Sequence, residues 1–275
     1  MDSKNWVSKM KPRHLYRKLK FTLWIPLKIT RKPHSSSASI SDLFPLRKDD
    51  DWETYFELLD VTGLISGNNS RSSEKKALFV FYDKDGSLLG EKLENISSSG
   101  RTTIHLDENF DSRTKFASSF AVFHDSKSLA SDIGSSFIAE RGYTGYAHRN
   151  SGMRGYVHGN LDALAYENGI VEPLGNSGLL SRVYYVQHPL RGPARYEFFI
   201  SNPTSRTVKV KIELRLSNED WQCVEKLVIP SKGSRVFQIN KTEKSPSFLR
   251  IRSRLYLGRP VVFRIMDRGF DVFHG

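Results

Sequence analysis

The sequence predicts an all-β protein: two related antiparallel β-sandwich units joined by a Gly/Tyr/His-rich segment, with a basic N-terminal arm. Segments rich in β-branched and aromatic residues recur roughly every eight to twelve residues, polar turns separate them, and the same succession appears twice. We divide the 275 residues into an arm and linker (1–45), a first sandwich unit (46–127), a central segment (128–192) and a second sandwich unit (193–275).

Residues 1–34 form the basic arm. They contain ten Lys and Arg against one acidic residue, a net charge of +9, which leaves +3 of the formal +12 for the rest of the chain. Because the body is nearly neutral, we do not expect it to bind nucleic acid, which requires a large positive surface. The polar, small residues 33–39 are typical of a linker.

The arm contains one apolar stretch, residues 21–27, which is too short for the ~20 residues of a transmembrane helix. Basic residues flank it, so we predict contact with an anionic membrane surface. The predicted contact residues are Lys18, Lys20, Phe21, Trp24 and Lys28. A disordered basic tail and a mitochondrial presequence are the alternatives.

The first unit is predicted from five strand-like segments, residues 55–59, 76–82, 88–93, 102–106 and 116–123. Between the second and third, Asp83-Lys84-Asp85-Gly86 is typical of a hairpin turn, in which glycine adopts positive φ.

The second unit repeats this plan with segments 196–200, 208–216, 221–228, 236–240 and 249–265. Residues 208–216 alternate apolar and polar side chains, the pattern of a half-buried strand. The turn at 231–234 corresponds to the turn at 97–100, which suggests an internal repeat with an insertion at residues 67–76.

A resemblance supports this second unit. Asn202 stands at its first turn, Val-Ile-Pro precedes a Lys-Gly-Ser turn at 232–234, and residues 236–240 read Val-Phe-Gln-Ile-Asn. In these features residues 193–268 resemble the small β-sandwich of the sensory rhodopsin transducer family. The resemblance implies a sandwich fold and an accessory, ligand-binding or partner-binding module rather than a catalyst.

Residues 137–166, inside the central segment, concentrate the unusual side-chain chemistry of the chain. Their glycines recur every three to seven residues, which is too dense for a helix and indicates tight turns or a closely packed backbone. The spacing matches neither a phosphate-binding loop nor a dinucleotide-binding motif, so we expect no cofactor.

Tyrosine, amide and arginine side chains favour a polar ligand surface, and carbohydrate is the predicted ligand. Tyrosine rings offer flat faces to sugar C–H groups, and amides and guanidinium groups form planar hydrogen bonds. The predicted contacts are Arg141, Tyr143, Tyr146, His148, Asn150, Arg154, Tyr156, His158, Asn160 and Asp162. The alternative is that these side chains form a packed seam between the two units.

The residues that a catalytic or a metal-binding site would use do not follow a known sequence motif with fixed spacing. A hydrolase or transferase would use His158, Asp162 and Glu140, whose separation the sequence does not determine. A metal site would use His148, His158 and Asp162 with Glu140 or His124, but no short His-x-His or His-Glu-x-x-His motif supports it, so we expect no metal.

These observations predict a non-catalytic binding or accessory protein, linked to cell-surface polysaccharide assembly at the cytoplasmic face of the membrane. The single cysteine agrees with a cytoplasmic location and provides no disulfide framework. The main alternatives are the hydrolase or transferase and a purely structural or protein-interaction module. Exposed sheet edges would also allow a homodimer.

Overall fold

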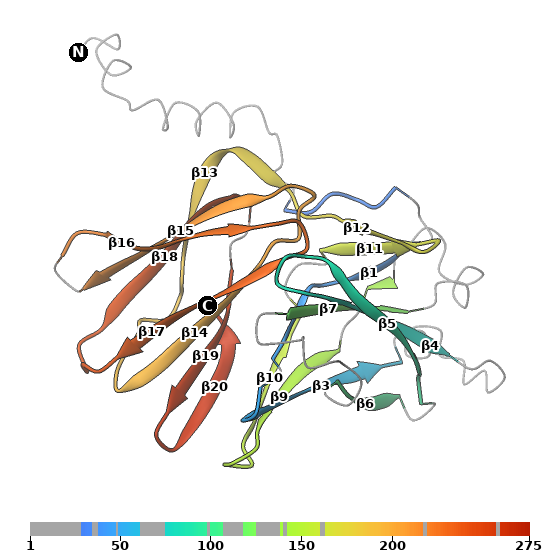
Figure 1. Cartoon of the computed structure of the whole chain (residues 1–275), viewed down its shortest axis with the longest axis horizontal. Coiled ribbons are helices and arrows are strands. Elements are labelled where there is room, and N and C mark those ends of the chain that lie inside the picture. Colours follow the sequence, from blue (N-terminus) through green and yellow to red (C-terminus); the bar gives the residue numbers. More distant parts are fainter. Residues whose placement is uncertain are drawn as a thin grey trace, which may run out of the picture.

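The computed structural model describes residues 29–34, 38–47, 49–60, 75–97, 100–106, 118–124, 138–139, 142–159, 163–216, 219–256 and 259–275. Within these ranges all regular elements are strands, which confirms the all-β prediction. The strands form five four-stranded sheets, which we number 1 to 5 in the order in which they pack (Figure 1). The described residues contain no helix with the length and hydropathy needed to span a bilayer.

Sheets 1 to 3 form the N-terminal half. Sheet 1 has the order β12 (Ile170–Pro173), β11 (Leu164–Glu167), β1 (Ser39–Ser41) and β8 (Ile138–Ala139). Sheet 2 has the order β2 (Phe44–Leu46), β7 (Ser118–His124), β4 (Lys76–Tyr82) and β5 (Leu88–Asn95). Sheet 3 has the order β10 (Arg154–His158), β9 (Tyr143–His148), β3 (Trp52–Leu59) and β6 (Arg101–His105).

Sheets 4 and 5 form the C-terminal half. Sheet 4 has the order β17 (Ser234–Lys241), β14 (Ala194–Ser201), β19 (Val261–Met266) and β20 (Gly269–His274). Sheet 5 has the order β13 (Ser177–Tyr185), β18 (Ser247–Leu255), β15 (Val208–Leu216) and β16 (Gln222–Ile229). The strands of both sheets pair in antiparallel fashion.

Strand β4 of sheet 2 is covered on both faces. Its residues Ala77, Phe79 and Phe81 pack in the core shared with sheet 3, whereas Val80 and Tyr82 pack toward sheet 1. Successive side chains of a strand point to opposite faces, so a strand covered on both sides must be apolar throughout. This accounts for the continuous apolar run at residues 77–82.

The core of the C-terminal half lies between sheets 4 and 5. It contains alternate residues of β14, β15 and β18, namely Tyr196, Phe198, Ile200, Val208, Val210, Ile212, Leu249 and Ile251. Because these side chains face inward, the residues between them on β15 and β18 face away from sheet 4.

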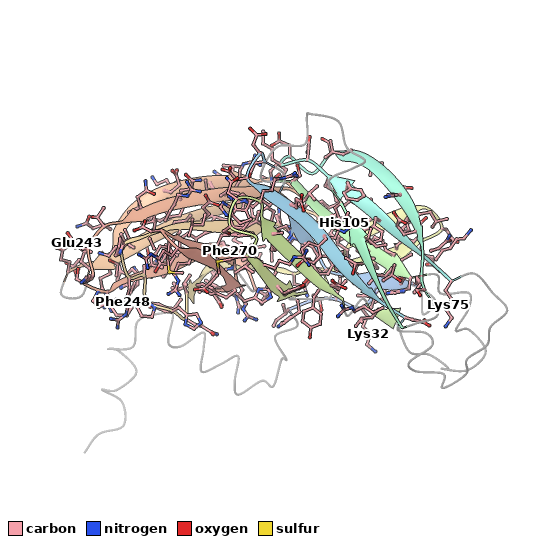
Figure 2. All side chains as sticks on the ribbon, turned by 90° about the horizontal axis from the view of Figure 1, so that it is seen from below. Lys32, Lys75, His105, Glu243, Phe248 and Phe270 are labelled. Atoms are coloured by element: carbon pink, nitrogen blue, oxygen red, sulfur yellow. The ribbon has the colours of Figure 1, made fainter. Side chains whose placement is uncertain are left out.

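The two halves meet where sheet 3 packs against sheet 4. Trp52, Tyr146 and Val157 of sheet 3 contact Phe263 and Phe270 of sheet 4 in one buried cluster. Phe270 lies at this junction in the middle of the elongated molecule (Figure 2). The halves therefore share a hydrophobic core.

A buried ion pair lies beside this cluster. The Arg47 guanidinium lies 2.7 Å from a Glu197 carboxylate oxygen, and both side chains are almost completely buried. Arg47 also lies over the Trp52 ring, 4.0 Å from its centroid, and pairs with Asp49 at 3.1 Å. Since Arg47 follows β2 and Glu197 belongs to β14, the pair connects the two halves.

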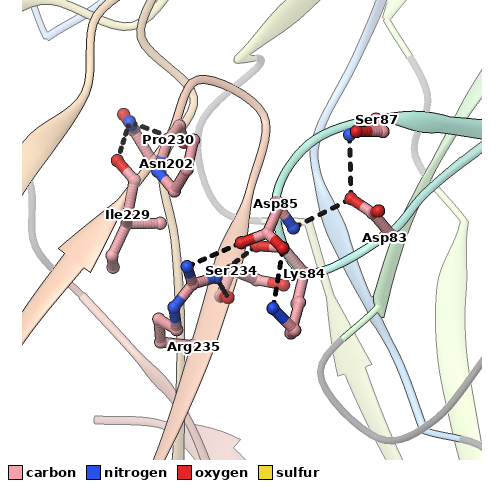
Figure 3. Close-up of polar contacts among 9 residues, drawn as sticks. All are labelled: Asp83, Lys84, Asp85, Ser87, Asn202, Ile229, Pro230, Ser234 and Arg235. Carbon is pink, nitrogen blue, oxygen red and sulfur yellow. Dashed lines mark hydrogen bonds and ion pairs between the residues drawn. The ribbon is translucent and has the colours of Figure 1, made fainter.

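The β4–β5 hairpin makes a second connection (Figure 3). Arg235 binds the Asp85 carboxylate at 2.7 Å, and the Ser234 amide donates to the Lys84 carbonyl at 3.0 Å. Gly86 has φ of 82°, and a Cβ there would lie 2.0 Å from the Ser231 carbonyl oxygen. The hairpin tip therefore packs directly against the turn before β17.

Buried Asn202 fixes that turn from the other side. Its side-chain amide donates to the carbonyl oxygens of Ile229 and Pro230, each at 2.9 Å, and its own backbone carbonyl accepts from the Lys232 amide. The turn is therefore held in one conformation against the hairpin.

The prediction of two sandwich units is right only in its fold class. Five small sheets take the place of two sandwiches, because the central segment supplies strands rather than a connector: β9 and β10 join sheet 3, and β13 joins sheet 5. Described residues of the predicted arm and linker also contribute β1 and the start of β2. The internal repeat is not confirmed by this arrangement.

Candidate binding site

The outer face of sheet 3 gathers several of the predicted site residues. In the strand register Tyr156 lies opposite Gly145, Gly145 opposite Tyr55, and Tyr55 opposite His105, which forms one row across four strands. Paired residues point to the same side of a sheet. Tyr156, Tyr55 and His105 therefore share one face.

A second row runs beside the first. His158 lies opposite Tyr143, Tyr143 opposite Glu57, and Glu57 opposite Thr103. Arg154 joins the same face, since it lies two residues before Tyr156 on β10. We name this surface the aromatic face and define it by Tyr55, His105, Tyr143, Arg154, Tyr156 and His158; His105 is labelled in Figure 2.

Two tyrosines of the aromatic face are open to solvent. Tyr143 is 46% exposed and Tyr156 is 47% exposed. Because Tyr143 pairs with His158, Tyr156 is its diagonal neighbour on the adjacent strand, close enough for one extended ligand to touch both rings.

Tyr55 lies flat against the sheet because β9 has a glycine at the matching position. A Cβ at Gly145 would lie 2.2 Å from the Tyr55 Cζ, so only glycine leaves room for this ring. The Tyr55 ring meets Tyr156 edge-on with centroids 5.6 Å apart.

The Tyr55 hydroxyl is buried next to Tyr156. It has no well-formed hydrogen bond with any group in the described part of the chain. Burial, and then the neighbouring Tyr156, raises the pKa of Tyr55 well above its usual value, so this hydroxyl remains a hydrogen-bond donor.

Glu57 is a buried carboxylate on this face, and its neighbours neutralise it. The Arg101 guanidinium lies 3.1 Å away, and the Thr103 hydroxyl donates to the same oxygen at 3.0 Å. A second described carboxylate, Glu53, lies at the edge and pairs with Arg149. Both carboxylates are therefore engaged in ion pairs, which does not favour acid–base chemistry on this face.

His158 lies at the border of the aromatic face toward β20. Its Nδ1 donates to the Gly159 carbonyl, and its own carbonyl accepts from His274 Nε2 at 2.8 Å. The two imidazole centroids are 4.9 Å apart. Burial is the main cause that lowers the pKa of His274 to about 4, so this histidine is neutral at pH 7.

Three predicted contacts lie elsewhere. Tyr146 faces inward and is completely buried, with its hydroxyl donating to the Pro45 carbonyl at 2.9 Å, so it is a core residue and not a ligand contact. His148 packs beside Trp52 on the same inner side, with centroids 5.0 Å apart. Asn150 lies in the β9–β10 turn and donates to Asp51.

The remaining predicted residues lie outside the described ranges. They are Glu140, Arg141, Asn160 and Asp162 of the central segment, and Lys18, Lys20, Phe21, Trp24 and Lys28 of the arm. The catalytic alternative therefore has only His158 among the described residues. No cluster of three potential metal-ligating side chains occurs in the described ranges.

Sequence reasoning missed Tyr55, Glu57 and His105. They belong to predicted strands, but their positions opposite β9 depend on which strands pair, and local patterns do not specify this pairing. The alternation of Tyr55 with Phe56 and of Ile104 with His105 was the available signal, because each pair places its polar member on the outer face.

Comparisons with known proteins do not show a family for this chain. No family model matches the chain, and no curated protein matches it. One similar solved structure is an "anti-sigma factor domain-containing protein", with a TM-score of 0.21 and 10% identity over 83% of this chain and 79% of the other. Another is a beta-glucuronidase from glycoside hydrolase family 2, with a TM-score of 0.19 and 10% identity over 90% of this chain and 25% of the other.

At these TM-scores neither structure supports an argument about fold or function. Neither bears on the resemblance to the sensory rhodopsin transducer family, which stays a prediction.

Proposed function

We propose that this protein is a non-catalytic binding protein whose aromatic face holds a carbohydrate chain. The observation that carries the proposal is the pair of half-exposed tyrosines, Tyr143 and Tyr156, on adjacent strands and on one face of sheet 3. Aromatic rings with one open face and a polar tip suit sugar rings, which present both C–H groups and hydroxyls.

The polar residues around the tyrosines suit the same ligand. Arg154 borders Tyr55 on one side, with 5.7 Å between the guanidinium carbon and the ring centroid, and exposed His105 and His158 lie at opposite edges of the face. A guanidinium group and imidazoles bind hydroxyl or carboxylate groups. We therefore expect acidic or neutral saccharides rather than amino sugars.

We also propose a cellular role for this binding. Assembly of cell-surface polysaccharide at the cytoplasmic membrane face would combine a saccharide-binding surface with the membrane contact predicted for residues 1–34. A homodimer through exposed strand edges also stays a prediction.

Calorimetric titration with neutral, amino and acidic oligosaccharides tests the binding function. We expect the wild type to bind at least one acidic or neutral member, and Tyr143→Ala and Tyr156→Ala each to weaken that binding about tenfold, because each removes one stacking surface. The matched control is Tyr185→Ala, since Tyr185 is 56% exposed but belongs to sheet 5.

Three outcomes would contradict the proposal: no binding to any saccharide, equal loss in all three variants, or no loss in either sheet 3 variant. Turnover of a bound saccharide that His158→Ala abolishes would favour the hydrolase or transferase instead.

A further inference from the structure

Sheet 5 has a strongly basic outer surface that sequence reasoning did not anticipate. Residues on β15 and β18 that alternate with the core residues point away from sheet 4, and Lys226 of β16 lies opposite Lys211. We name this surface the basic face; it contains Lys209, Lys211, Arg215, Lys226, Arg250, Arg252 and Arg254, with one carboxylate, Glu213.

The basic face holds seven positive charges and one negative, a net charge of +6. Burial alone would raise the pKa of Glu213, but hydrogen bonds from Lys211, Arg252 and Arg250 lower it to about 2. Glu213 is therefore ionised at pH 7 and offsets one of the three cations around it.

Cations also lie next to one another on this face. Lys226, Lys211 and Arg252 lie opposite each other on three adjacent strands, and Glu213 pairs with Lys211, Arg252 and Arg250. Like charges in directly opposite positions destabilise a sheet, and one carboxylate balances only one of these charges, so an anionic partner would stabilise the row.

One end of the basic face also presents exposed aliphatic side chains. Leu179 is 88% exposed and Leu180 is 59% exposed on edge strand β13, and Val228, opposite Lys209, is 52% exposed. β13 pairs with β18 at Ser177–Leu255 and again at Arg182–Ser253, so Leu179 and Leu180 lie in the irregular stretch of β13 beside Arg254. The exposed acids Glu219 and Asp220 belong to the β15–β16 turn, at the other end of the face.

The basic arm enters the fold beside the same end. The Arg31 amide donates to the Leu174 carbonyl at 2.8 Å, and the Asn176 amide donates to the Ile29 carbonyl at 2.9 Å. Asn176 immediately precedes β13 (Figure 1). The described end of the arm, from Ile29 to Arg31, is therefore held beside the start of β13, at one edge of sheet 5.

We infer that the outer surface of sheet 5 docks on an anionic lipid membrane. Basic residues contact the headgroups, and the aliphatic residues at the β13 edge enter the interface between headgroups and acyl chains. The docking surface thus belongs to the folded body and does not depend on the arm alone, and it is separate from the aromatic face.

Single-stranded nucleic acid is the competing polyanion, and the exposed side chains of sheet 5 favour lipid over it. Such binding stacks bases on exposed aromatic rings. Trp221 already has the guanidinium carbon of Arg250 at 4.2 Å and that of Arg215 at 4.9 Å from its ring centroid. Tyr185, opposite Arg250, is one exposed ring on this face, whereas the other exposed large apolar side chains of sheet 5 in the described ranges, Leu179, Leu180, Val224 and Val228, are aliphatic, and these insert into lipid but do not stack on bases.

Vesicle co-sedimentation of the full chain tests the inference. The vesicles are phosphatidylcholine, alone or with about one third phosphatidylserine, and we expect binding to the anionic vesicles only, weakened by high salt. Lys209→Glu/Lys226→Glu should weaken binding about tenfold or more, because it reverses two charges on the face. Leu179→Ser/Leu180→Ser should weaken it at constant charge.

The matched control is Lys244→Glu/Arg268→Glu, which makes the same change in net charge at exposed positions outside the basic face. It should retain wild-type binding, and unchanged melting temperatures would show that all variants fold. Four results would overturn the inference: no wild-type binding to anionic vesicles, no loss in the face variants, equal loss in face and control variants, or tighter binding to a single-stranded oligonucleotide that the face variants abolish.

Discussion

Individual buried polar residues in this protein depend on a few specific partners. His274 is the clearest case, because its Nε2 has one acceptor, the His158 carbonyl, and its Nδ1 is buried without a hydrogen-bond partner among the described groups. Protonation would place a charge with an unsatisfied donor in the interior. Such a group makes stability depend on pH.

We expect His274 to destabilise the fold in mild acid. Its folded pKa of about 4 lies below the usual 6.5, so the unfolded chain binds the proton first, and stability present above pH 6.5 is lost as the pH falls to 4. The loss should be about 3 kcal/mol. Denaturant unfolding at several pH values should show a flatter profile for His274→Gln.

Exposed His188 provides the control, since His188→Gln should keep the wild-type slope. An unchanged slope in His274→Gln between pH 6.5 and 4 would contradict the assignment to His274.

Glu213 affects stability at lower pH than His274. Its pKa of about 2 means that its contribution to stability is present above pH 4.5 and is lost as the pH falls toward 2.

Hairpins in this fold have two kinds of turn, free and docked. The β11–β12 turn contains Asn168 and Gly169, both with positive φ, and a Cβ at Gly169 would meet open space. The β4–β5 turn has Gly86 at the same φ of 82°, yet it packs against the turn before β17. Alanine substitutions at the two glycines therefore distinguish the cost of backbone strain alone from the added cost of disrupting the docked turn.

We expect Gly86→Ala to cost about 3 kcal/mol or more, because the new methyl group would collide with the Ser231 carbonyl oxygen and separate the hairpin from β17. Gly169→Ala should cost only about 1 kcal/mol, the penalty of a left-handed backbone with a side chain. Chemical unfolding of both variants measures the difference, and equal costs would mean that docking adds nothing to stability.

At the element scale, strands with a clear period were predictable and glycine-rich strands were not. The alternating residues 208–216 coincide with β15, whereas β9 and β10 contain glycines that suggested turns. Gly145 belongs to a strand because the Tyr55 ring occupies the space of its missing side chain, and Gly155 likewise lies under Phe270. These partners come from distant strands, so no local pattern shows them.

The candidate site, like the strands, could be predicted from the sequence only in part. Tyr143, Arg154, Tyr156 and His158 were identified, but Tyr146 was assigned to the same surface although it is three residues from Tyr143 and so faces the core. A strand assignment for residues 143–148 would have separated them, since odd and even positions face opposite sides.

At the scale of the whole molecule, the two halves are joined by shared buried groups. The cluster around Trp52 and Phe263, the Arg47–Glu197 pair and the docked hairpin all cross the junction. Halves that bury apolar surface against each other lose it together when either unfolds. The five sheets should therefore behave as one cooperative unit.

We expect one calorimetric unfolding transition for the wild type, and a loss of about 3 kcal/mol in Glu197→Ala, because the buried Arg47 guanidinium would lose its buried carboxylate partner. Glu53→Ala, which removes the exposed partner of Arg149 at 3.2 Å, should cost less than about 1 kcal/mol. Two separate transitions in the wild type, or equal losses in the two variants, would show that the junction contributes little.

The position of Cys223 has a practical consequence. It is the only cysteine in the sequence, it is exposed on edge strand β16, and it lies opposite Glu213 at the border of the basic face. A maleimide dye would therefore label the native chain at one place without engineering. Its emission would report on anything that approaches sheet 5, while ligands of the aromatic face, on another sheet, would leave it unchanged.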